Sequence, residues 1–156
     1  EEAPQNRPQW EIVGYYLDQG DFDVCRENVI KAVKENEGLG AIVCTFGYHA
    51  PLALEALKDV EGGAEVEIIA FDEEERTLAG VENGRIHATI VQDPFLFGVE
   101  AVLMLEKVRK GKFLSLPVSN GAVGIHCKAI TKDRLPESRE QLDSRLASGK
   151  PAEGED

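Results

Sequence analysis

Positive charge is scarce in this 156-residue chain. It has 17 Lys and Arg against 29 Asp and Glu, which gives a formal net charge of −12 at pH 7. Affinity for nucleic acid arises largely from Lys and Arg that displace counterions from phosphates, and no basic cluster here is free of carboxylates. The composition therefore argues against nucleic acid and anionic membrane surfaces as partners.

Long hydrophobic runs are absent as well. The longest apolar run, about Ala41 to Tyr48, is far shorter than the roughly 20 residues that span a bilayer. Residues 1–9 are polar and lack the basic-then-apolar order of a secretory signal. Either the protein has no such signal or the signal lies outside this chain.

Cysteine is rare, with only Cys25, Cys44 and Cys127, and no two of them have CxxC spacing. A chain of this length buries roughly 70% of the surface that its unfolded form exposes, so it can build a core without disulfides or metals. We expect the cysteines to be small buried hydrophobic residues rather than metal ligands or redox groups.

Short β-branched runs alternate with longer segments of helical period from residue 10 to residue 131. This pattern is typical of parallel strands joined by crossover helices, and it predicts an α/β fold: a three-layer, Rossmann-like domain with an open parallel sheet. The expected strands are Ile12 to Leu17, Ala41 to Phe46, Val66 to Phe71, His87 to Gln92 and, later in the chain, Ile125 to Thr131.

Helical periodicity and capping signals predict a helix after each of the first four strands and one near the end of the chain. The fourth is apolar on more than one side, so a single packing surface cannot cover it. The expected helices are 23–36, one that begins at Pro51, one that begins at Asp72 with Glu75 completing a capping box, 94–110 and 136–147.

Polar side chains follow the predicted strands at their carboxyl ends, where open parallel sheets bind ligands. Carboxylate, imidazole, amide and phenol groups on one edge could hydrogen-bond a polyhydroxylated molecule, and Tyr48 offers a face to sugar C–H groups. The candidate positions are residues 18–21, 47–50, 72–74 and 92–93.

Each candidate also has a purely structural interpretation. Asp72 can cap a helix, His49 can be an exposed loop histidine, and Gln92 can bridge the turn before Asp-Pro. The first helix is expected to be capped by Asp18, Asp21 and Asp23.

Catalytic motifs are missing. The sequence has no GxSxG, HExxH or GxxxxGK[ST], and no GxGxxG after a strand. Gln92 stands where a phosphoacceptor domain has a Ser or Thr hydroxyl, and His49, His87 and His126 have no metal-ligand spacing. We therefore expect no enzyme, no cofactor and no metal site.

Several spaced motifs resemble the C-terminal half of the type I periplasmic sugar-binding proteins, the ribose/galactose-type solute receptors of ABC importers. The likeness covers about residues 10–135 and keeps the family's motif order. Residues 70–84 read AFDEEERTLAGVENG, similar to the family's GFD followed by acidic residues and TLxGIxxG. Residues 88–95 read ATIVQDPF, similar to its ATVVQxP, and residues 48–53 read YHAPLA, similar to its YNxPxA. Residues 129–133 read AITKD, similar to its closing VITKDN.

The resemblance implies a non-catalytic periplasmic or other extracytoplasmic receptor that binds a sugar or polyol between two lobes and presents it to an ABC permease. It implies that Asp72 accepts hydrogen bonds from sugar hydroxyls, that Gln92 lies at the crossing between the lobes, and that His49, next to Tyr48, replaces a sugar-binding Asn. The alternative is the effector-sensing core of a lactose-repressor-type regulator. A third interpretation is an enzyme that uses Asp72 and His49 as an acid/base pair.

Family members have two lobes and about twice this length, so residues 10–135 are expected to form a partial C-terminal lobe of a truncated protein. Residues 94–112 would pack on a missing lobe or a partner chain, residues 1–9 would be a linker or disordered, and residues 136–156 would form a C-terminal helix and an acidic tail. The exposed apolar surface predicts a homo-oligomer in which protomers exchange the fourth helix.

Overall fold

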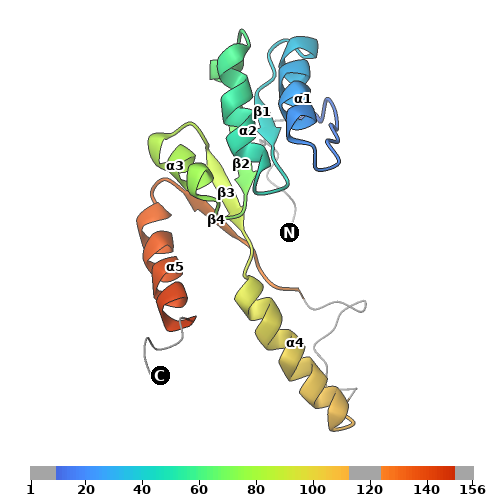
Figure 1. The fold of residues 1–156 in the computed structure, drawn as a ribbon, viewed down its shortest axis with the longest axis vertical. Coiled ribbons are helices and arrows are strands. Elements are labelled where there is room, and N and C mark those ends of the chain that lie inside the picture. Colours follow the sequence, from blue (N-terminus) through green and yellow to red (C-terminus); the bar gives the residue numbers. More distant parts are fainter. Residues whose placement is uncertain (1–9, 113–123, 150–156) are drawn as a thin grey trace, which may run out of the picture.

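The computed structural model describes residues 10–112 and 124–149 (Figure 1). The expected linker over residues 1–9 and the end of the acidic tail, residues 150–156, lie outside the described residues. In chain order the elements are α1 (Phe22–Glu35), β1 (Ala41–Val43), α2 (His49–Ala56), the 3₁₀ turns η1 (Leu57–Asp59) and η2 (Gly63–Glu65), β2 (Glu67–Phe71), α3 (Glu75–Asn83), β3 (Ala88–Val91), α4 (Pro94–Arg109), β4 (Lys128–Thr131) and α5 (Leu135–Gly149).

The four strands form one open sheet in the order β1-β2-β3-β4. The first three are parallel, with Ile42 opposite Ile68 and Ala70 opposite Thr89, whereas β4 runs antiparallel to β3, with Ile130 opposite Thr89. Each parallel pair is joined by a helix, as a crossover between parallel strands requires. The α/β class and the open sheet are confirmed, but the sheet is only mostly parallel, because β4 is antiparallel. The described helices form one layer beside the sheet, so the expected three-layer arrangement is not seen in the described residues.

One face of this sheet is covered by helices. The helices α1, α2, α3 and α5 contact one another in that order, and α2, α3 and α5 contact β2, β3 and β4. The core between the layers contains Ile68, Val81 and Ile86, of which none is more than 1% exposed. Burial of three such side chains contributes about 1.5–3 kcal/mol each. On the edge strand β1, by contrast, Val43 is exposed.

The predicted strand over Ile12 to Leu17 is wrong. Among the described residues this segment has no ladder partner, and its large apolar side chains, Tyr15 and Leu17 among them, are exposed. A strand needs a neighbour that satisfies its backbone N–H and C=O groups, and the apolar pattern alone does not supply one.

The N-caps of the helices match the sequence in two cases. Asp21 caps α1 by accepting hydrogen bonds from the amides of Asp23 and Val24, and Asp93 caps α4 through the amide of Leu96. Helix α2, however, begins at His49, two residues before the Pro51 that was expected to open it.

The cap expected for α3 is wrong by two residues. Glu74, not Asp72, accepts the hydrogen bond from the Thr77 amide at 3.0 Å. Asp72 has a φ of 69°, which lies in the left-handed region and does not lead into a helix. The longer side chain of Glu74 reaches the first turn in its place.

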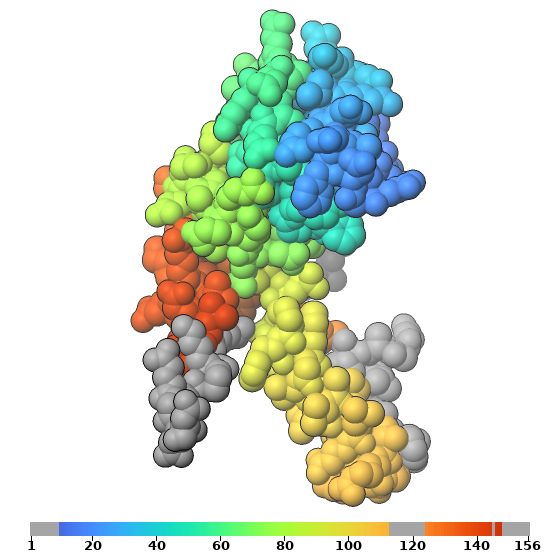
Figure 2. Space-filling view, in the orientation of Figure 1, coloured from blue at the N-terminus to red at the C-terminus, as the bar shows by residue number. Residues whose placement is uncertain are grey.

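Helix α4 projects away from the sheet and its helix layer (Figures 1 and 2). None of its residues is buried, and Phe95 and Leu105 are 72% and 68% exposed. The apolar character on several sides of this helix is therefore not used by the described residues of this chain. None of the helices in the described ranges is long and apolar enough to cross a membrane.

The cysteines differ in burial. Cys25 and Cys44 are buried, as expected, but Cys127 is exposed just before β4, and all three are free thiols. The expectation that every cysteine is buried was wrong for Cys127, which lies outside the regular elements, just before the edge strand β4.

Candidate functional site

The carboxyl ends of β2 and β3 bring Asp72 and Gln92 together. Each residue directly follows its strand, and the strands are parallel neighbours. Nε2 of Gln92 donates a hydrogen bond to Oδ1 of Asp72 at 3.3 Å. A carboxylate and an amide therefore form one polar unit at the edge of the sheet where ligands of such folds bind.

The backbone of Asp72 is held in an unusual conformation by β3. Its amide donates to the carbonyl of Ile90 at 3.0 Å, and its own carbonyl accepts from Oγ1 of Thr89 at 2.7 Å. The left-handed φ costs a non-glycine residue about 1–2 kcal/mol, and Asp tolerates it better than most residues because its short side chain can hydrogen-bond locally. Gly47 lies beside the carboxylate, since a Cβ there would be 3.5 Å from Asp72 Oδ2.

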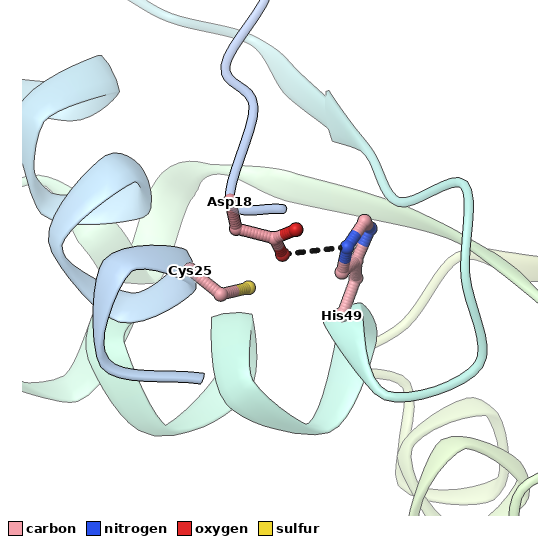
Figure 3. A group of neighbouring side chains, drawn as sticks. All are labelled: Asp18, Cys25 and His49. Atoms are coloured by element: carbon pink, nitrogen blue, oxygen red, sulfur yellow. Dashed lines mark ion pairs between the residues drawn. The ribbon is translucent and has the colours of Figure 1, made fainter. Parts of the chain in front are cut away.

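His49, at the start of α2, contacts Asp18 (Figure 3), and so does its neighbour Tyr48. The Tyr48 hydroxyl lies 3.0 and 3.1 Å from the two carboxylate oxygens, and His49 Nε2 lies 2.8 Å from Oδ2. His49 Nε2 is fully buried, but it makes no well-aligned hydrogen bond with any described residue. The close approach to Asp18 is thus an electrostatic contact rather than a well-directed hydrogen bond.

The four predicted site residues therefore fall into two groups: Asp72 with Gln92, and Tyr48 with His49. Within the described ranges, no hydrogen bond or ion pair joins His49 to Asp72, so the acid/base pair of the enzyme interpretation is not formed. His49 is also not a free loop histidine, because its side chain is only 16% exposed.

Aromatic rings gather around Tyr48. Phe22 stacks on it with ring centroids 4.9 Å apart, and Phe46 lies on it at 6.1 Å. His49 packs edge-on against Tyr48 at 4.4 Å. Phe22 and Phe46 are more than half exposed, so they offer apolar faces of the kind that pack on sugar C–H groups.

Sequence reasoning missed the roles of Asp18, Phe22 and Phe46. It assigned Asp18 to the cap of α1, but the cap is Asp21, and Asp18 accepts from the Gly20 amide at 3.0 Å and faces α2 instead. A signal was present for Asp18, which directly follows the predicted strand Ile12 to Leu17 and belongs to the candidate positions 18–21.

The environment of Asp18 keeps it ionised. Burial raises its pKa, but the Gly20 amide, the Tyr48 hydroxyl and His49 together outweigh this and hold the pKa below the ordinary 3.8. Burial and the hydrogen bond to Asp18 raise the pKa of the Tyr48 hydroxyl. At neutral pH the pair is thus a carboxylate acceptor and a protonated phenol donor.

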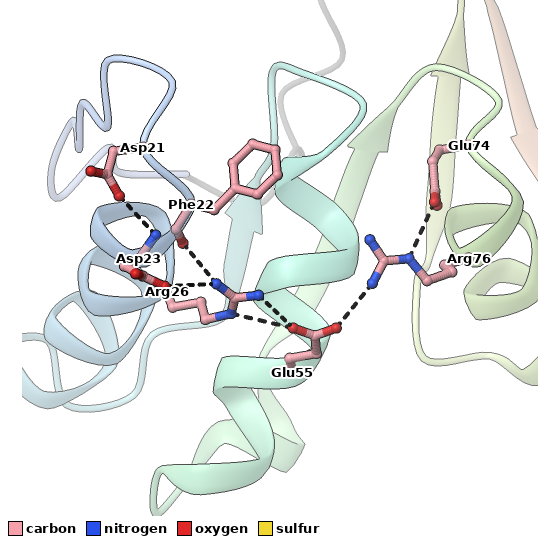
Figure 4. A network of polar contacts seen from close by, with 7 residues as sticks. All are labelled: Asp21, Phe22, Asp23, Arg26, Glu55, Glu74 and Arg76. Carbon is pink, nitrogen blue, oxygen red and sulfur yellow. Dashed lines mark hydrogen bonds and ion pairs between the residues drawn. The ribbon is translucent and has the colours of Figure 1, made fainter.

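Charged side chains on α1, α2 and α3 hold these helices in register (Figure 4). Nε and Nη2 of Arg26 bond Oε2 of Glu55 at 3.3 and 3.1 Å, and Arg76 bonds Oε1 of Glu55 at 3.0 Å and Glu74 at 3.2 Å. Exposed pairs of this kind contribute about 0–1 kcal/mol each. Their importance is positional, because α1 carries the loop that brings Asp18 to α2.

An open, mostly parallel sheet whose strand ends gather carboxylate, amide and aromatic groups defines a ligand-binding α/β lobe. No family model and no curated protein matches the chain. Solved structures do. XylFII, solved in the XylFII-LytSN complex, is 27% identical with a TM-score of 0.58, over 74% of this chain and 38% of that one.

Two further structures have the same fold. An ABC transporter solute-binding protein from Burkholderia graminis, in complex with D-arabinose, is 25% identical with a TM-score of 0.61, over 74% of this chain and 39% of its own. GanP, a glucose-galactose binding protein from Geobacillus stearothermophilus, is 23% identical with a TM-score of 0.63, over 76% and 40%. This chain spans about two fifths of such proteins, so it corresponds to a partial lobe of the type I periplasmic sugar-binding proteins, as the motifs predicted.

Proposed function

We propose that this chain forms part of the ligand-binding lobe of a non-catalytic, extracytoplasmic receptor that delivers a sugar or polyol to an ABC permease. The observation that carries the proposal is the hydrogen-bonded Asp72–Gln92 pair at the ends of β2 and β3. Likeness to the solute-binding protein from Burkholderia graminis, solved in complex with D-arabinose, supports a sugar as the ligand class.

The geometry of the pair suits hydroxyl recognition. Asp72 Oδ1 accepts from Gln92, which leaves Oδ2 and the Gln92 carbonyl oxygen to accept hydrogen bonds from hydroxyl groups. Hydrogen bonds to a charged acceptor are the strong ones, roughly twice as strong as neutral ones. The exposed rings of Phe22 and Phe46, which stack on Tyr48, supply an apolar surface at the start of α2.

The mechanism is hinge closure. A ligand that bridges two lobes binds the closed state more tightly and therefore favours it by that differential affinity. We propose that α4 packs against the second lobe or a partner chain, because its apolar residues are exposed in the described part of the chain. With one lobe alone, half of the contacts are missing, and affinity is weak.

Weak binding calls for a method that detects millimolar affinity. Titration of the ¹⁵N-labelled chain with D-arabinose, other pentoses, hexoses and inositol should shift the backbone amides of Gly47 and Asp72 and the side-chain amide of Gln92. Asp72→Asn keeps the shape but removes the charge, and it should abolish the shifts. Asp59→Asn, an exposed acidic position in η1, is the matched control and should leave them unchanged. Absence of shifts at tens of millimolar sugar, or equal binding by Asp72→Asn, contradicts the proposal.

A further inference from the structure

A second set of reactive side chains lies beside the aromatic rings. A carboxylate oxygen of Asp18, Sγ of Cys25 and a ring nitrogen of His49 all lie within 4.8 Å of one another (Figure 3). They come from the loop before α1, from α1 itself and from the start of α2. All three are sheltered, with Cys25 6% exposed and the side chains of His49 and Asp18 16% and 10% exposed.

The chemistry of this set matches one class of ligand. Thiolate, imidazole and carboxylate are the groups that bind Zn²⁺, whereas Mg²⁺ and Ca²⁺ require oxygen ligands throughout. Around a tetrahedral Zn²⁺ with bonds of about 2.0–2.3 Å, ligand atoms lie about 3.3–3.8 Å apart. The separations here, from 2.8 Å between His49 and Asp18 up to 4.8 Å, reach that spacing by side-chain adjustments of about 1 Å.

The side chain of His49 adds a second observation. Its Nε2 atom is fully buried without an aligned hydrogen bond to any described residue. Its polar neighbour is the Asp18 carboxylate, so the nitrogen has a charged contact but no directed hydrogen bond, and a bound cation would satisfy it. The nitrogen lies next to Asp18 Oδ2, where a cation would contact both groups.

We propose that Asp18, Cys25 and His49 bind a divalent transition-metal ion of the Zn²⁺ type, with solvent in the fourth position. The Gly20 amide and the Tyr48 hydroxyl, which bond Asp18, orient the carboxylate as outer partners. The site goes beyond the proposed sugar site, because Asp72 and Gln92 take no part in it.

Binding requires one proton transfer. Burial raises the pKa of the Cys25 thiol to about 11, so at neutral pH the free site holds a thiol. When the metal–sulfur bond forms, the S–H bond breaks and its proton passes to solvent, and no electron is transferred.

Co²⁺ is a suitable probe, because thiolate coordination produces an intense charge-transfer absorption that carboxylate or imidazole coordination alone does not. The titration is done in the Cys127→Ser background, which removes the exposed thiol. We expect saturation at one equivalent, displacement by Zn²⁺, and no effect of Mg²⁺. Cys25→Ser should abolish the charge-transfer band, and Asp18→Asn and His49→Asn should weaken binding more than the roughly tenfold expected for Tyr48→Phe.

Two controls keep the outcome decisive. His87→Asn changes an exposed histidine paired with Glu67 and should leave the cobalt spectrum unchanged. Asp72→Asn should remove sugar binding but keep cobalt binding. Cys25→Ser should remove the cobalt charge-transfer band but keep sugar binding. The two proposals can therefore be refuted independently of each other. No spectral change with Co²⁺, or a charge-transfer band that persists in Cys25→Ser, overturns the metal site.

Discussion

Gln92 donates a hydrogen bond to Asp72 across 20 residues of chain, at the ends of adjacent parallel strands. The contact joins the two side chains that the sequence motifs single out, and it fixes their relative position before any ligand binds. A preorganised pair of this kind reduces the ordering cost of recognition. It also makes the backbone at Asp72 a sensitive point of the fold.

We expect Asp72→Gly and Asp72→Val to separate backbone strain from ligand binding. Glycine adopts a φ of 69° without steric cost, so Asp72→Gly should retain the free energy of unfolding within about 1 kcal/mol. The β-branched valine should lower it by about 2 kcal/mol or more. Denaturant unfolding measures both, and neither variant should bind sugar. Equal stabilities would contradict the left-handed conformation.

The pH dependence of stability should reveal Asp18. Its folded-state pKa is depressed below 3.8, so its contribution is present above the unfolded-state value and is lost as pH falls through the folded-state pKa. Asp18→Asn should therefore be less stable than the parent at pH 7, by about 1–2 kcal/mol. The difference should shrink below pH 3.8, as thermal unfolding at a series of pH values would show. A difference that stays constant down to pH 2 would argue against this account.

Thiol labelling should distinguish the three cysteines. Burial raises the pKa of Cys25 to about 11 and that of Cys44 to about 12, whereas Cys127 is exposed. The thiolate is the reactive form. A disulfide reagent at pH 8 should therefore modify Cys127 rapidly, and Cys25 and Cys44 only when the protein unfolds. Cys127→Ser should remove the fast phase. Rapid modification of two or more thiols in the native protein would show that the core is open.

Self-association should depend on α4. Its exposed apolar residues, Leu105 among them at 68% exposed, are expected to be buried between protomers, with the helix exchanged. Leu105→Glu should then shift the chain towards monomer in size-exclusion chromatography with light scattering. Leu146→Glu, at a similarly exposed leucine on α5, is the matched control. A parent chain that is monomeric at high concentration would refute the expectation.

Helix and strand positions could be predicted from the sequence because burial periodicity is a local property. The helix around Val29 and the strand around Ile68 both follow from it. The segment around Tyr15 could not be assigned in this way, because its apolar pattern suits a strand but the described structure gives it no ladder partner. The local pattern indicates that a segment suits a strand, but it does not show whether a neighbouring strand is available for backbone pairing.

The sequence by itself determined the α/β class, the candidate pair Asp72 and Gln92, and the unused apolar surface of α4, since each depends on order and periodicity along the chain. Only the tertiary structure decided that Asp18 faces Tyr48 and His49, 30 residues away from Tyr48, and that Glu74 replaces Asp72 as the cap of α3. These outcomes depend on which of several side chains lies close enough to bond a given polar group. That competition is settled by distances in space, which spacing along the chain does not encode.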